Sequence, residues 1–185
     1  MFIETESTPN PATLKFLPGR TVMGPSTADF ASAEAAGRSP LATALFALPG
    51  VEGVFLGDDF VTVSKADGVT WQALKPQVLG TLMDHFIHNR PVIEGKADAA
   101  DEDVDPADAE IVAQIKQLID TRVRPAVAGD GGDIIFRGFR DGVVRLQMQG
   151  ACSGCPSSTA TLKHGVENML RHYVPEVKSV EQVTV

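Results

Sequence analysis

The chain of 185 residues has only two cysteines and lacks the apolar runs of a membrane protein. No apolar stretch approaches the roughly 20 residues that cross a bilayer as a helix, so we expect no membrane span. The first residues, Met1 to Glu6, have neither the basic start and apolar core of a signal peptide nor the arginines of a transit peptide. We therefore expect a cytoplasmic protein of a bacterium or, alternatively, the processed form of a mitochondrial matrix protein.

Basic charge is also scarce, since the net charge is −8 and the pI about 4.9. This disfavours non-specific nucleic-acid binding, which needs a basic surface. Much of the acidity lies in residues 94–107, which have almost no large apolar side chains and include Pro106. Such a segment cannot bury enough surface to offset its ordering entropy. The sequence therefore predicts two domains, 1–93 and 108–185, joined by an acidic flexible linker, 94–107.

The first domain shows short extended segments alternating with helical ones. We expect strands at 2–6 and 13–17, a helix after Ser39-Pro40, and a strand pair at 51–56 and 60–64. A last helix is indicated by apolar residues at helical period, namely Trp71, Leu74, Val78, Leu82 and Phe86. Pro76 lies inside that run, so the helix is either kinked there or starts later than Thr70. The expected order is β-β-α-β-β-α, a small α/β sandwich.

The second domain begins with a helix predicted over residues 108–123, with a buried stripe of Ile111, Ile115, Leu118 and Ile119. Pro125 and the loop Gly129–Asp133 are expected to end it. The elements expected after the loop are strands at 134–139 and 143–149, a helix from Pro156 and a strand at 177–185. The order α-β-β-α-β places helices on one face of a three-stranded sheet. Both domains are therefore of the α+β class.

The two cysteines, Cys152 and Cys155, lie three positions apart in a glycine-flanked turn. Pro156 suits the first position of a helix, which places Cys155 at or beside the N-cap. Free backbone N–H groups and the helix dipole there favour the thiolate, the form that binds metal or attacks disulfides. Gly154 gives the turn the backbone freedom to aim both sulfurs outward. The pair can bind a metal or cluster, or close into a redox disulfide.

Two thiolates are too few for the usual metal sites of this kind, because a zinc ion or a cubane cluster takes about four ligands. His164 lies more than two turns along the helix, and His85, His88 and His172 have no evident relation to the turn. Two copies of the chain would supply four thiolates around one cluster, at a subunit interface close to solvent. A zinc-bridged dimer acting as an adaptor is the corresponding zinc hypothesis.

A thioredoxin-like thiol–disulfide oxidoreductase is the competing interpretation, because a dithiol at a helix N-terminus fits that activity equally well. The surrounding order does not fit it. A thioredoxin fold has a βαβ unit leading into the motif, whereas here a predicted hairpin precedes Cys152.

Residues from about 108 to 185 resemble the NifU-like C-terminal domain of Nfu-type iron–sulfur scaffold and carrier proteins. The matching segments are Arg124-Pro125, Gly129–Asp133, Gly150–Ser158 and Thr161–Lys163. Residues 1 to about 90 resemble the Nfu N-terminal domain, through Thr8–Pro11 with Lys15-Phe16, and Trp71 with Lys75-Pro76.

The resemblance implies a non-enzymatic carrier in which Cys152 and Cys155 of two subunits bridge a four-iron four-sulfur (4Fe-4S) cluster. Its partners would be apo iron–sulfur target proteins that receive the cluster, upstream cluster-assembly proteins, and a second copy of the chain. The N-terminal domain would contribute recognition of partners. We expect the loop Gly129–Asp133 to be structural, with unusual backbone angles, rather than to supply ligands.

Overall fold

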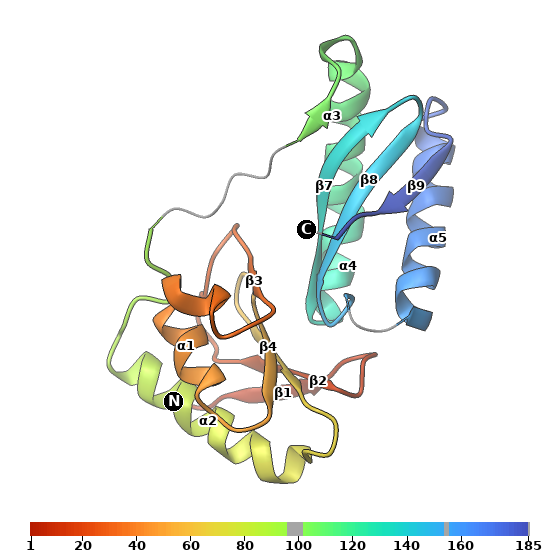
Figure 1. Cartoon of the computed structure of the whole chain (residues 1–185). Helices are drawn as coiled ribbons and strands as arrows, with labels where there is room; N and C mark the ends of the chain where they lie inside the picture. Colours follow the sequence, from red (N-terminus) through yellow and green to blue (C-terminus); the bar gives the residue numbers. More distant parts are fainter. Residues whose placement is uncertain (96–101, 154–155, 185) are drawn as a thin grey trace. The chain divides into compact units, whose positions relative to one another are not determined.

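The computed structural model describes residues 1–95, 102–153 and 156–184. It divides the chain into two compact units, an N-terminal unit (Met1–Ala97) and a C-terminal unit (Asp98–Val185), shown in Figure 1. Both units combine helices with a sheet, which confirms the α+β class. Within the described ranges, no helix has the length and apolar character that crossing a bilayer requires.

The N-terminal unit is a five-stranded antiparallel sheet with the order β1-β2-β5-β4-β3. Its strands are β1 (Glu4–Ser7), β2 (Thr13–Leu17), β3 (Ala28–Phe30), β4 (Val51–Leu56) and β5 (Val61–Lys65). Its helices are the 3₁₀ turn η1 (Ala35–Arg38), α1 (Pro40–Phe46) and α2 (Trp71–Ile87). The two α-helices pack on one face of the sheet (Figure 1), and their buried leucines share one core with the strands.

The start of α1 follows the sequence prediction, because Pro40 is the first helical residue and Ser39 is the cap. The Ser39 hydroxyl oxygen accepts the amide N–H of Ala42 at 3.0 Å. The same hydroxyl donates to the carbonyl oxygen of Val92 at 2.6 Å. Next to it, the amide of Glu94 donates to the carbonyl oxygen of Arg38 at 2.7 Å. The segment after α2 is therefore held against the beginning of α1.

The residues behind the N-terminal resemblance lie together in space. The indole N–H of Trp71 donates to the carbonyl oxygen of Pro11 at 3.2 Å, and its ring meets that of Phe16 edge-on. The Asn10 side chain accepts the amide of Ala12 at 3.0 Å, closing the turn that the two prolines predict. Through these contacts, the residues that carry the resemblance hold the start of α2 against β2 and the turn before it.

The N-terminal unit differs from the predicted order in one stretch and answers one point that the sequence left open. The sequence analysis missed β3 and η1, because a three-residue edge strand carries too little alternation to be recognised. It also left the path of the last helix open, and α2 begins at Trp71 and runs through Pro76. The observed order is therefore β-β-β-α-β-β-α for strands and α-helices.

The C-terminal unit has a four-stranded sheet with the order β6-β7-β8-β9 and helices on one face (Figure 1). Its strands are β6 (Asp103–Val104), β7 (Gly132–Arg140), β8 (Val143–Gly150) and β9 (Ser179–Gln182). Its helical segments are η2 (Pro106–Asp108), α3 (Ala109–Leu118), the π-helical η3 (Ile119–Val123), α4 (Arg124–Gly129) and α5 (Pro156–Tyr173). β7 and β8 are antiparallel, whereas β6 and β9 run parallel to their neighbours.

The predicted hairpin and its faces are confirmed. Asp141 and Gly142 both have positive φ, at 53° and 83°, as a tight hairpin turn requires. Along β8, Val144, Leu146 and Met148 are buried in the core. Alternation at a period of two therefore predicted this strand correctly.

The sheet has four strands instead of the three expected, because β6 lies in the stretch 94–107 that composition assigns to a linker. Hydrophobicity gives no sign of this strand, since its position depends on pairing with Gly138 and Phe139 far along the chain. Residues 96–101 of the predicted linker lie outside the described residues.

The prediction that Pro125 ends the first helix is also wrong. Helical structure continues through Pro125 to Gly129, because η3 interrupts the regular bonding pattern and a new helix, α4, starts at Arg124. In the first turn of a helix, the N–H that proline lacks would have no partner anyway. The buried stripe shifts accordingly to Val112, Ile115, Ile119 and Val123, leaving Ile111 and Leu118 half-buried.

Candidate metal centre

Cys152 lies in the turn that joins β8 to α5, at the opposite end of β8 from the hairpin turn at Asp141. Gly150 starts the turn with a φ of 66°, and its carbonyl oxygen accepts both the amide N–H of Ser153 at 3.2 Å and the Ser153 hydroxyl at 2.9 Å. The turn is thus closed by its own hydrogen bonds. The second predicted ligand, Cys155, and the neighbouring Gly154 lie outside the described residues.

The Cys152 side chain is buried, with 7% of the residue exposed, and belongs to the apolar core of the C-terminal unit. The expectation that both sulfurs point outward is therefore wrong for Cys152. The reason is Gly132 on β7: a Cβ added there would lie 2.9 Å from Cys152 Sγ and 2.5 Å from the carbonyl oxygen of Gln149. A glycine at this position leaves the space into which the sulfur packs.

Burial, helped by the negative charges of Asp130 and Asp133, raises the pKa of the Cys152 thiol to about 11. The thiol is therefore protonated at neutral pH in the protein without metal. The sequence interpretation expects a helix dipole to favour the thiolate at Cys155. At Cys152 the effect of burial is larger and favours the protonated thiol. Binding of a metal ion to this sulfur must displace a proton.

Two further hydrogen bonds hold the turn. The Thr159 hydroxyl, in the first turns of α5, donates to the carbonyl oxygen of Cys152 at 2.8 Å. The amide of Ala151 donates to the carbonyl oxygen of Gly131 at 3.2 Å, and Gly131 has a φ of 83°. The loop Gly129–Asp133 thus has the unusual backbone angle predicted for it, and it supports the turn through its backbone.

An ion pair that the sequence analysis missed anchors this loop. The Arg124 guanidinium donates to both carboxylate oxygens of Asp133, at 2.9 and 2.8 Å. The Asp133 side chain is only 5% exposed and also accepts the amide of Ile134 at 2.8 Å. This pairing raises the pKa of Arg124. A signal was present in the sequence, because Arg124 precedes the glycine-rich loop and the oppositely charged Asp133 ends it, nine residues later.

No histidine joins Cys152 in a group of three or more possible ligands among the described residues. His85 belongs to α2 of the N-terminal unit, and His88, the C-cap of that helix, lies 3.2 Å from Asp84. His164 and His172 are exposed on α5. Among residues 1–95, 102–153 and 156–184, no three His, Cys, Asp or Glu side chains form a group that could hold a metal ion. The described part of one chain thus supplies one thiol, Cys152, without the group of three or more ligands that would hold a metal ion.

Fold and site together define a two-unit α+β protein with a candidate thiolate site on a strand–turn–helix. Residues 3–89 match the family model described as "Scaffold protein Nfu/NifU N terminal", and residues 115–181 match that of the "NifU-like domain". The chain therefore belongs to the Nfu family, as the sequence resemblance indicates.

Two similar proteins agree with this assignment, those of Arabidopsis thaliana and Drosophila erecta. "NifU-like protein 5, mitochondrial" of Arabidopsis thaliana is 54% identical over 98% of this chain and 68% of its own length. "NFU1 iron-sulfur cluster scaffold homolog, mitochondrial" of Drosophila erecta is 54% identical over 99% of this chain, which spans 65% of that protein. A solution structure of a NifU-like protein from Saccharomyces cerevisiae aligns with 52% of this chain and 87% of its own, at 30% identity and a TM-score of 0.47.

Proposed function

We propose that this protein is an iron–sulfur cluster scaffold and carrier, in which Cys152 and Cys155 of two copies hold one 4Fe-4S cluster for transfer to apo-proteins. The observation that carries the proposal is the placement of Cys152 on a supported turn, in a chain of the Nfu family with only two cysteines. A cubane cluster takes about four thiolates, and one chain has two. The second copy supplies the others.

The state of Cys152 fits a carrier better than a permanent cofactor site. A buried thiol with a pKa of about 11 must lose its proton to bind iron, which weakens the net binding. When the cluster leaves, the sulfur regains its proton and its apolar contacts with the core. Release is thereby made easier, as handing a cluster to another protein requires.

The same pKa argues against a thiol–disulfide oxidoreductase. An attacking cysteine reacts as its thiolate, and enzymes of that class lower the pKa of the attacking thiol. At Cys152 the pKa is raised instead. We therefore favour cluster holding over thiol–disulfide exchange and propose that the protein is not an enzyme.

The proposal extends to partners and location. The recipients are apo iron–sulfur proteins, the donors are upstream cluster-assembly proteins, and the N-terminal unit recognises partners, since it contains no cysteine. The relatives from Drosophila erecta and Arabidopsis thaliana are both named mitochondrial. This favours the mitochondrial matrix, our alternative location, over a bacterial cytoplasm.

Anaerobic reconstitution with iron and sulfide tests the proposal. The product should be brown, should have twice the mass of one chain, and should contain about four iron atoms per dimer. Cys152→Ser and Cys155→Ser should each remove the iron. Thr121→Ala is the control outside the turn, because the Thr121 hydroxyl donates to the Gln117 carbonyl oxygen one helical turn earlier.

Two results would contradict the proposal. One is a monomer that carries its full complement of iron, since a single chain lacks the thiolates for it. The other is protein, purified without oxygen, that contains stoichiometric zinc and cannot be loaded with iron, which would establish the zinc-bridged adaptor instead.

A further inference from the structure

The short edge strand β6 has a close fit to the C-terminal sheet. Asp103 pairs with Gly138 and Val104 with Phe139, in parallel register. A Cβ added to Gly138 would lie 2.6 Å from the carbonyl oxygen of Asp103. Gly138 therefore allows the backbone of β6 to approach, and the register shift between Phe136 and Gly138 adapts β7 at this point.

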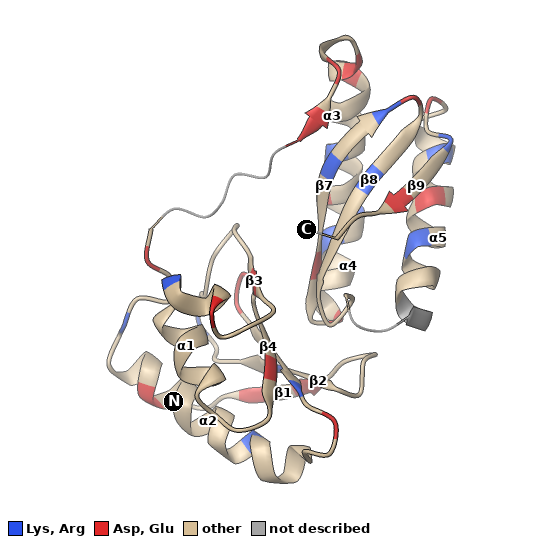
Figure 2. Cartoon of the chain, in the orientation of Figure 1, with Lys and Arg blue, Asp and Glu red and all other residues tan. Residues whose placement is uncertain are grey.

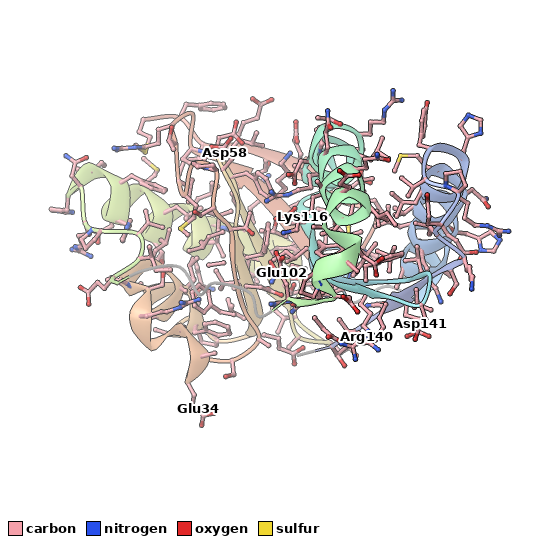
Figure 3. The ribbon with its side chains drawn as sticks, turned by 90° about the horizontal axis from the view of Figure 1, so that it is seen from above. Glu34, Asp58, Glu102, Lys116, Arg140 and Asp141 are labelled. Atoms are coloured by element: carbon pink, nitrogen blue, oxygen red, sulfur yellow. The ribbon has the colours of Figure 1, made fainter. Side chains whose placement is uncertain are left out.

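Three cationic side chains from three elements surround β6. Arg140 of β7 and Arg145 of β8 each donate to a different oxygen of the Asp103 carboxylate, both at 2.8 Å. Lys116 of α3 lies 2.7 Å from a carboxylate oxygen of Glu102. Figure 2 shows the acidic β6 beside the basic positions of β7 and β8, and Figure 3 labels Glu102, Lys116 and Arg140. We call this set of three cations with the β7 edge the basic edge.

The basic edge matches a short sequence pattern, that of residues 102–104. Glu102 and Asp103 fill the positions next to the cations, and Val104 packs half-buried against the core of the unit. After Val104 the chain turns away, because the Asp105 side chain accepts the amide of Ala107 at 2.9 Å and starts η2. Two acids followed by an aliphatic residue in extended conformation therefore satisfy the whole site.

The contacts that hold β6 are individually weak. The paired side chains are 35 to 56% exposed. Exposed pairs of this kind contribute about 0–1 kcal/mol each. A strand of two residues adds only two backbone pairings. The segment can therefore leave without unfolding the sheet, and its departure would uncover three cations and an open strand edge, which binds extended peptides readily.

We propose that the basic edge is a docking site for an acidic extended segment of a partner protein, which adds parallel to β7 in place of Glu102–Val104. In the free protein the chain's own residues, Glu102–Val104, occupy the site, and a partner segment that binds more tightly displaces them. The site involves no cysteine. It lies at the other end of β7 from Gly132, six residues and about 20 Å away along the strand. Its occupancy is independent of the proposed cluster binding.

Peptide binding to the full chain tests this proposal. The probe is a synthetic peptide with the sequence of residues 101–106, followed through the amide NMR signals of Gly138 and Phe139. In the wild-type chain the tethered segment competes at an effective concentration in the millimolar range, so binding should be weak. The chain variant Glu102→Gln/Asp103→Asn should bind the peptide about tenfold more tightly, because its own segment no longer holds the cations.

Substitutions at the cations should have the opposite effect. Arg140→Ala/Arg145→Ala, placed in the Glu102→Gln/Asp103→Asn chain, should weaken peptide binding at least about tenfold. Lys116→Gln serves the same purpose if the double arginine variant fails to fold. Arg137→Ala is the matched control, since Arg137 bonds to Gln147 and not to Asp103. Cys152→Ser should bind the peptide like its parent, which separates this site from the proposed cluster site.

Three results would overturn the proposal. The first is equal binding of a peptide in which the acids corresponding to Glu102 and Asp103 are replaced by their amides. The second is a set of shifted signals that excludes Gly138 and Phe139. The third is a dimer of the variant chain that the peptide cannot dissociate, which would show that the edge receives a second copy of this chain instead of a partner.

Discussion

Both units pack helices against one face of a sheet, but their cores differ in what they contain. In the N-terminal unit, an antiparallel sheet and two helices enclose an apolar core built from phenylalanine, leucine and valine. In the C-terminal unit, the core reaches the cysteine turn, and glycines at Gly132 and Gly138 allow close approaches that a side chain would block. The comparison teaches where the close approaches differ: at Gly132 and Gly138, beside the two proposed sites, a Cβ would meet backbone, whereas at Gly50 and Gly57 of the N-terminal unit it would meet side chains.

The largest effect on the C-terminal unit is expected from Gly132→Ala. The new Cβ would meet backbone at 2.5 Å and Cys152 Sγ at 2.9 Å, so strands and turn must separate. We expect a loss of about 3 kcal/mol in the unfolding free energy of this unit and a loss of iron loading. The N-terminal unit should melt unchanged in the same calorimetric scan.

Gly165→Ala is the matched control for that change. Gly165 lies in α5, and a Cβ there has no neighbour within 4 Å. Alanine in a helix is favoured over glycine by up to about 1 kcal/mol, so this variant should be more stable than the parent. Equal losses of stability in the two variants would show that the contacts of Gly132 with Gln149 and Cys152 are not the cause of the effect.

The buried ion pair should come next in effect. Asp133→Asn leaves the Arg124 guanidinium with one weakened acceptor, and we expect about 2 kcal/mol of destabilisation after allowing for the partial exposure of Arg124. Asp120→Asn, which removes the longer and more exposed contact of Arg124 at 3.4 Å, should change stability by less than about 0.5 kcal/mol. Denaturant titration of both variants measures the difference, and equal values would refute the special role of Asp133.

The two units should also differ in their response to alkaline pH. The folded C-terminal unit holds Cys152 with a pKa of about 11, above its ordinary value of 9.0. The unfolded chain therefore loses this proton first as pH rises, and stability falls between pH 9 and about 11. Cys152→Ala should remove this part of the pH dependence, which thermal melts of the metal-free protein across that range would show.

The smallest expected effect concerns His85 of the N-terminal unit, whose pKa is lowered chiefly by burial and secondarily by Arg90. Its Nε2 has no hydrogen-bond partner among the described residues. The unfolded chain binds a proton here more readily than the folded one, so stability should fall as pH drops below 6.5. His85→Leu should flatten that acid limb, while His88→Leu should leave it in place.

Local signals predicted much of this fold. Ser39-Pro40 identified the start of α1, Asp141-Gly142 identified the hairpin turn, and alternation identified the inward face of β8. Each signal depends on residues close together in the chain. The position of Cys152 between β8 and α5 was predicted in the same way, from the glycines and proline around it.

The features that were missed depend on contacts between distant residues. β6 exists because Gly138 admits its backbone, which no property of the acidic stretch itself indicates. The burial of Cys152 depends on Gly132 across the sheet, and the helix past Pro125 depends on the π-helical η3. Family resemblance implied the chemistry that we propose for the cysteine pair, but the raised pKa of Cys152 emerged only from its packing.

The two hydrogen bonds that fasten Val92 and Glu94 to the start of α1 have a mechanical consequence. Tension applied to the chain beyond Glu94 would load these bonds before it reached the end of α2. Ser39 would transmit part of that force into the first turn of α1, through the oxygen that accepts the amide of Ala42. The two bonds thus protect the C-terminal end of α2 from being unwound when the chain after Glu94 is pulled.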